Sequence, residues 1–119
     1  FNYITDTFML QFFNDYNKCN KMTNKFDEMV NSGGLVLVDF TAAWCGPCKR
    51  QTPILEQFIS ANPQVKLVVI DIDASAELVE RYGIKSVPTL ILFKDGKKVD
   101  MKNGLTSLSF LTTLIENNS

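Results

Sequence analysis

Two cysteines separated by two residues are the side chains of this sequence best suited to chemistry. They lie in the segment Trp44-Cys45-Gly46-Pro47-Cys48. A cysteine pair at this spacing can close a small disulfide ring, or it can supply half of the ligands of a metal site. The choice between these uses depends on the residues around the pair and on the residue types that the chain lacks.

The chain contains no histidine and only three cysteines. Catalysis by a Cys–His pair, a histidine general base and a histidine-containing zinc site within one chain are therefore excluded. A zinc site made only of cysteines needs four of them. Metal binding by Cys45 and Cys48 would thus require a second chain or carboxylate ligands, and we expect no metal cofactor.

The composition is that of an ordinary globular protein. The chain has 119 residues, of which 45% are hydrophobic and 21% charged, enough for one domain with one core. The net charge is −1 and no run of Lys and Arg occurs, so we expect no nucleic-acid partner. The longest apolar runs, such as 35–38, are too short to span a bilayer, so we expect no membrane insertion.

A strand before the cysteine pair and a helix after it must position the two thiols. Residues 35–40 form a near-continuous apolar run around Asp39, which is typical of a central strand covered on both faces. The pair then lies where the following loop enters a helix over about 47–60, whose first turn tolerates Pro47. Burial raises the pKa of a carboxyl group, so Asp39 is a candidate base for the proton of Cys48. The alternative is a solvated or paired carboxylate at a strand end.

The rest of the chain alternates between helix and strand patterns. In order, we expect a helix over about 23–32, a strand over 65–73, a helix over 75–82, a hairpin of strands 90–93 and 97–102 turning at Asp95-Gly96, and a last helix capped by Ser107. Residues 17–22 are a possible short first strand, although their composition is poor for one. Strand–helix–strand order predicts parallel pairing and the hairpin predicts antiparallel pairing, so the expected fold class is α/β with a mixed sheet.

The first twenty residues look like an addition to this domain. An apolar residue recurs every four positions, at Ile4, Phe8, Phe12 and Tyr16. We expect a helix that packs this stripe on the domain. The alternatives are a dimer or partner surface and a membrane-surface helix, which the lack of Lys and Arg on the polar face disfavours. The predicted organisation is an N-terminal amphipathic helical extension over residues 1–20 and one domain over residues 21–119.

Motifs along the whole domain resemble the thioredoxin family. They are Val38-Asp39-Phe40, Trp44-Cys45-Gly46-Pro47-Cys48-Lys49, Pro53, Tyr82-Gly83-Ile84, Val87-Pro88-Thr89 and Gly104. A C-G-P-C segment after a strand with an Asp, followed about forty residues later by Val-Pro-Thr, is far more specific than C-x-x-C alone. The resemblance implies a thioredoxin fold, with a central mixed sheet of four to five strands flanked by helices and here an extra N-terminal helix. It also implies a protein-disulfide reductase without a cofactor, whose redox group is the Cys45–Cys48 disulfide.

The two cysteines are expected to have different roles. Cys45 would lie at a helix N-terminus, which favours a thiolate, so we expect it to attack the substrate and form a mixed disulfide. Cys48 lies one turn further and would resolve this intermediate, with Asp39 taking its proton. Two purely structural thiols are the alternative, although structural cysteines prefer buried apolar sites to a loop beside a tryptophan.

The resemblance also implies a substrate site around Cys45. Pro88 would be a cis-proline that faces the active site and exposes the backbone of Val87 to an extended substrate segment. The expected substrate-binding patch is flat and apolar and consists of Trp44, Gly46, Pro47, Val87, Pro88 and Gly104.

Three positions depart from the pattern of the family. Thr41 stands where an aromatic residue is frequent, and Ala43 where an acidic residue is common. Val69 occupies the position of a lysine that pairs with the buried aspartate in bacterial members. We expect these three changes to alter how the surroundings of Asp39 and Cys48 adjust their reactivity. The exchange of thiols and disulfides itself is expected to remain the same.

The partners follow from the resemblance alone. It implies thioredoxin reductase as the electron donor, disulfide-containing protein substrates such as peroxiredoxin, a role in cell redox homeostasis, and a monomer or weak dimer. The alternatives are a subunit that mainly docks within a larger complex and a dedicated organellar or secretory-route redox protein. We expect a cytoplasmic location by default, or a mitochondrial or secretory-route one if a leader was removed. Cys19 matches no catalytic position, and we expect a bystander, with a regulatory or dimer-linking thiol as the alternative.

Overall fold

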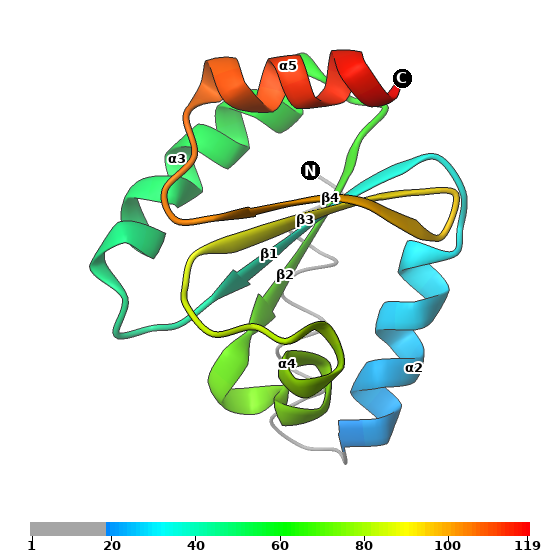
Figure 1. Ribbon diagram of the computed structural model, residues 1–119, viewed down its shortest axis with the longest axis vertical. Coiled ribbons are helices and arrows are strands. Elements are labelled where there is room, and N and C mark those ends of the chain that lie inside the picture. The colour runs from blue at the N-terminus through cyan, green and yellow to red at the C-terminus, as the bar shows by residue number, and fades with distance from the viewer. Residues whose placement is uncertain (1–18) are drawn as a thin grey trace.

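A four-stranded mixed sheet forms the centre of the fold (Figure 1). The structure, a computed structural model, describes the backbone of residues 19–119 and the side chains from Lys25 onward. The strands are β1 (Leu35–Thr41), β2 (Lys66–Asp71), β3 (Thr89–Lys94) and β4 (Lys97–Asn103). Their order in the sheet is β2-β1-β3-β4, with β1 parallel to β2 and antiparallel to β3. The predicted mixed sheet is thus confirmed, with four strands among the described residues.

Helices cover both faces of the sheet. They are α2 (Cys19–Val30), α3 (Gly46–Ala61), the 3-10 turn η1 (Ile72–Ala74), α4 (Ala76–Tyr82) and α5 (Leu108–Asn118). In Figure 1, α3 and α5 lie on one face, and α2 and α4 lie on the other. Within residues 19–119, no helix combines the length and the apolar character needed to cross a membrane.

Alternate residues of β1 belong to two separate hydrophobic clusters. Val38 and Phe40 pack with side chains of α2 and α4, whereas Leu35 and Leu37 pack with side chains of α3 and α5. Because successive residues of a strand point to opposite faces, Asp39 shares its face with Leu35 and Leu37. The strand therefore directs Asp39 toward the layer that contains α3, the helix that carries Cys48.

The chain before β1 differs from the expectation for residues 17–22. Cys19–Met22 form the first turn of α2, so the short strand is wrong, and the helix expected from residue 23 begins earlier. Residues 17–22 contain neither β-branched nor aromatic side chains, whereas the helix brings Phe26, Met29 and Val30 into the core. The helical extension expected over 1–20 falls, except for its last two residues, outside the described residues.

Local signals place the other boundaries close to their predicted positions. The second strand ends at Asp71 rather than at residue 73, because the Asp71 carboxylate accepts the backbone N–H of Asp73 (2.9 Å) and starts η1. Gly83 ends α4 in the left-handed conformation with φ 64°. The hairpin turns at Asp95-Gly96, and Ser107 Oγ accepts the N–H of Phe110 at the start of α5, as predicted.

Candidate functional site

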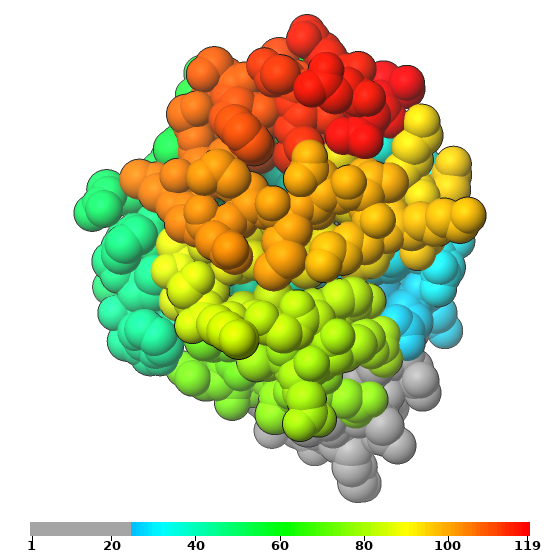
Figure 2. Space-filling model, viewed as in Figure 1, coloured from blue at the N-terminus to red at the C-terminus, as the bar shows by residue number. Residues whose placement is uncertain are grey.

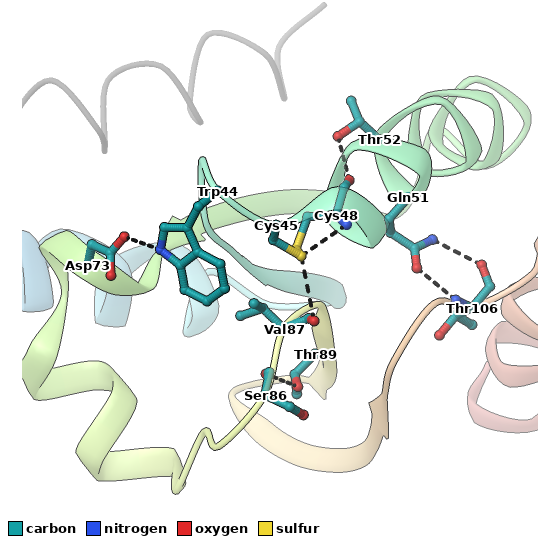
Figure 3. The surroundings of a disulfide bond; sticks show 10 residues. All are labelled: Trp44, Cys45, Cys48, Gln51, Thr52, Asp73, Ser86, Val87, Thr89 and Thr106. Atoms are coloured by element: carbon teal, nitrogen blue, oxygen red, sulfur yellow. Dashed lines mark hydrogen bonds between the residues drawn. A yellow bond between two sulfur atoms is a disulfide. The ribbon is translucent and has the colours of Figure 1, made fainter.

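Cys45 and Cys48 form a disulfide at the N-terminus of α3 (Figure 3). Cys45 is the N-cap of the helix, and Pro47 lies in its first turn. The Cα atoms of the two cysteines are 5.3 Å apart, and the backbone N–H of Cys48 donates to Cys45 Sγ over 3.1 Å. The sulfur of Cys45 thus receives a hydrogen bond from a helix end whose dipole favours negative charge.

The disulfide lies in a shallow apolar setting with an exposed rim. Cys45 is 4% exposed and Cys48 is 3% exposed, in a small cluster with Ala42 and Val87. Trp44 beside them is 67% exposed, which is unusual for so large an apolar side chain. The redox pair is therefore reached only at its edge, next to apolar surface that a partner can cover.

The segment before β3 approaches Cys45 from another part of the chain. The Val87–Pro88 peptide bond is cis, as the resemblance implied. Cys45 Sγ lies 3.6 Å from the carbonyl oxygen of Val87, and the carbonyl of Pro88 accepts the N–H of Gly104 (2.8 Å). Val87, Pro88 and Gly104 thus gather beside Cys45. Pro88 itself is buried, so it shapes the backbone of this segment more than it adds contact area.

Trp44 is held by an acidic residue that the sequence pattern did not single out. Its indole Nε1–H donates to Asp73 Oδ2 over 2.8 Å (Figure 3). Asp73 lies in η1, directly after β2, and parallel pairing of β1 and β2 brings the residues after both strands to one edge of the sheet. The acidic residues at the end of the predicted strand over 65–73 were the sequence signal that could have indicated this contact.

Asp39 is buried, and none of the side chains from Lys25 onward forms an ion pair with it. It is 3% exposed, and desolvation raises the pKa of its carboxyl group to about 7. Its Oδ1 atom has no hydrogen-bond partner among the described residues. The strand register places Val69 and Leu90 on either side of Asp39. The departure at Val69 therefore puts an apolar side chain, rather than a cation, beside this carboxyl group.

An open pocket of about 430 Å³ adjoins Cys48. The ends of β1 and β2 and the first turns of α3 form it, and its lining residues are Thr41, Ala42, Ala43, Cys48, Lys49, Thr52, Asp71 and Ala74. Two of the three departures from the family pattern, Thr41 and Ala43, belong to this lining. Their small side chains leave space open beside Cys48.

Another polar contact, which is buried, was missed because its residues look unremarkable in the sequence. The side chain of Gln51 in α3 bonds to the backbone of Thr106, and both residues are fully buried. Gln51 precedes Leu55 by four residues and so falls on the apolar stripe of the predicted helix. A polar residue on that stripe was the available signal.

The arrangement supports two-electron thiol chemistry. A dithiol that closes to a disulfide releases two electrons, and the two sulfurs stand at a helix N-terminus with a buried carboxyl group on the same side of the sheet. Within residues 19–119, no group of three or more His, Cys, Asp or Glu side chains is placed to hold a metal ion.

Comparisons with known proteins agree on one family. The family model described as Thioredoxin matches residues 17–117. Thioredoxin from Chlamydia muridarum is 52% identical over 84 residues, which are 71% of this chain and 82% of the relative. The structure of Plasmodium falciparum thioredoxin is 36% identical, with a TM-score of 0.74, covering 81% of this chain and 93% of that chain. A structure from work on thiol resolution in yeast mitochondrial 1-Cys peroxiredoxin through glutathione/thioredoxin systems is 30% identical, with a TM-score of 0.74, covering 79% and 88%.

Proposed function

The chain belongs to the thioredoxin family and is a thiol–disulfide oxidoreductase that reduces protein disulfides, and we propose that Cys45 and Cys48 are its reacting residues. The observation that carries the proposal is the disulfide at the start of α3, with Cys45 at the N-cap. Members of the family typically work without a cofactor. In our proposal the cysteine pair itself carries both electrons.

In the first step, the Cys45 thiolate attacks one sulfur of the substrate disulfide. The substrate S–S bond breaks, a mixed disulfide forms between Cys45 and the substrate, and the other substrate sulfur leaves as a thiolate that takes up a proton. The helix dipole and the N–H of Cys48, 3.1 Å from Cys45 Sγ, support the thiolate before attack.

In the second step, Cys48 attacks the sulfur of Cys45. The Cys48 thiol first gives its proton to the Asp39 carboxylate, whose pKa of about 7 suits proton exchange near neutral pH. The mixed disulfide breaks, the Cys45–Cys48 disulfide forms, and the second substrate sulfur leaves as a thiolate that takes up the proton held by Asp39. The substrate gains two electrons and two protons in total, and the enzyme dithiol loses them.

Substrate binding is proposed for the apolar rim beside Cys45. Trp44, Gly46 and Pro47 are exposed on one side of the disulfide. Val87, Pro88 and Gly104 form the other side, where Pro88 and Gly104 are joined by a backbone hydrogen bond. Small residues and exposed apolar surface allow an extended peptide segment with its disulfide to approach Cys45.

The family implies thioredoxin reductase and disulfide-containing proteins in general as partners. More specifically, we propose peroxiredoxins among the substrates and a monomer or weak dimer as the working form. The proposed division of the chain is a thioredoxin domain over 21–119 preceded by the extension over 1–20. A role limited to docking in a larger complex is not favoured, because such a role needs no closed Cys45–Cys48 pair.

Reduction of insulin disulfides by dithiothreitol tests the proposal. The wild-type protein should accelerate the reaction, and Cys45→Ser should return the rate to that of dithiothreitol alone. Cys19→Ser is the matched control, since it removes the third cysteine by the same substitution and should retain the wild-type rate. Catalysis that survives in Cys45→Ser, or that depends on Cys19, would contradict the assignment.

A further inference from the structure

The loop between β4 and α5 is anchored at two points, and Figure 3 shows the second of them, between Gln51 and Thr106. At its start, the N–H of Gly104 donates to the carbonyl of Pro88 over 2.8 Å. At its end, the N–H of Thr106 donates to Gln51 Oε1 over 2.7 Å, and Gln51 Nε2–H donates back to the carbonyl of Thr106 over 3.0 Å. Both bonds join the side-chain amide of Gln51 to the backbone of Thr106. They therefore fix the direction in which the loop runs as well as its distance from α3.

This two-bond contact joins the loop to the redox helix. Gln51 lies in α3, one turn after Cys48, and is 0% exposed, while Thr106 is 1% exposed. On its other side the loop is bonded to Pro88, next to the carbonyl that lies 3.6 Å from Cys45. The loop is therefore held between the two segments that surround the disulfide.

Leu105 stands between the two anchored residues and is 42% exposed. Since both of its neighbours are bonded to the protein, the backbone on either side of this exposed side chain is held in place. In Figure 2 the segment after β4, in orange, borders the yellow-green segment that leads into β3. The anchored loop thus presents a large apolar side chain at the border of the proposed substrate patch.

We propose that Gln51 is a positioning residue for protein substrates, which holds the 104–106 loop and Leu105 against the redox helix. This inference rests on the proposed function and adds to it a residue that touches neither the substrate nor the reacting sulfurs. Without the amide of Gln51, the N–H and the carbonyl of Thr106 are left buried and unpaired. Both groups then gain by moving to water, which displaces the loop.

The expected effect is on substrate binding rather than on chemistry. Gln51→Met keeps the length and flexibility of the side chain but removes both hydrogen bonds. We expect the KM for insulin to rise about tenfold, a change that corresponds to about 1.4 kcal/mol, while kcat stays within about twofold. Reduction of a small disulfide, 5,5′-dithiobis(2-nitrobenzoate), should be unchanged because this compound does not reach across to the loop.

Gln57→Met is the matched control, because it makes the same change on the exposed side of the same helix and should leave both reactions at the wild-type level. A Gln51→Met protein with the insulin KM of the wild type, or with equal losses on both disulfides, would overturn the positioning role. If the wild-type protein reduces neither compound, the proposed function fails instead. The two failures are therefore distinguishable.

Leu105→Ala provides a second route that does not depend on a buried substitution. It should raise the insulin KM about as much as Gln51→Met does, and the double variant should be no worse than either single variant, because both remove the same contact. Additive effects, or an insulin KM unaffected by Leu105→Ala, would show that the loop does not act through this side chain. Should Gln51→Met fail to fold, the insulin KM of Leu105→Ala alone decides whether the anchored loop acts on substrate binding.

Discussion

Replacing Asp39 by asparagine removes a buried carboxyl group and nearly preserves its shape. Burial raises the pKa of Asp39 from 3.8 to about 7 in the folded protein, and this difference corresponds to about 4 kcal/mol. Below about pH 4 the group is protonated in both the folded and the unfolded chain, so its ionisation contributes no difference in stability. Between about pH 4 and 7 the folded state binds more protons than the unfolded state, so the free energy of unfolding falls as the pH rises.

Asparagine carries no such pH-dependent cost. Relative to the wild type, Asp39→Asn should therefore gain stability from pH 4 to pH 8 by up to about 4 kcal/mol, on top of any constant cost of burying the amide. Guanidinium denaturation of the oxidised proteins measures this difference, because cysteines in the disulfide do not titrate. Asp100→Asn, on the exposed edge strand, controls for the substitution itself.

Two results would refute this reasoning about Asp39. A stability difference between Asp39→Asn and the wild type that does not vary with pH would show that the carboxyl group has an ordinary pKa. In the reduced enzyme, Asp39→Asn should slow insulin reduction while the fold stays intact, because Cys48 loses its base. Unchanged rates across the pH range would remove Asp39 from the mechanism.

Three further substitutions test other parts of the site and fold. Val69→Lys places an ammonium group beside Asp39 in the strand register, so it should lower the pKa of that carboxyl group. The pH profile of insulin reduction should then move at least about one unit lower, and an unshifted profile would contradict the register. Asp73→Ala frees the indole of Trp44, the only tryptophan in the chain, and should lower its fluorescence anisotropy. The free energy of unfolding should change by less than about 1 kcal/mol, and an unchanged anisotropy argues against this contact. Leu55→Ala should lower the free energy of unfolding by about 2–5 kcal/mol, since Leu55 is 2% exposed between α3 and the sheet; a loss well below 1 kcal/mol in guanidinium denaturation would rule out close packing there.

Much of the fold could be predicted because its signals are local. The apolar run around Asp39 shows a strand covered on both faces, Gly83 supplies the left-handed end of α4, and Asp95-Gly96 supplies the hairpin. Each of these features depends on a few adjacent residues. The helix between β1 and β2 then limits the pairing of these strands to a parallel one.

The rest could not be predicted because it depends on contacts between distant residues. Gln51 and Thr106 are 55 positions apart, and a polar residue on an apolar stripe does not indicate which residue is its partner. Trp44 and Asp73 are 29 positions apart and meet only because β1 and β2 run side by side. The helix at Cys19–Met22 was missed for a related reason, since its stability comes from core contacts made further along α2.

The central claim is that Cys45 attacks and Cys48 resolves, and trapping of the intermediate tests it most directly. Reduced Cys48→Ser, mixed with insulin and quenched with acid, should hold a stable mixed disulfide that peptide mass spectrometry locates on Cys45. Reduced Cys45→Ser, treated in the same way, should hold none. A stable linkage on Cys48 in the Cys45→Ser protein, or on Cys19 in either protein, would contradict the assignment of the two roles.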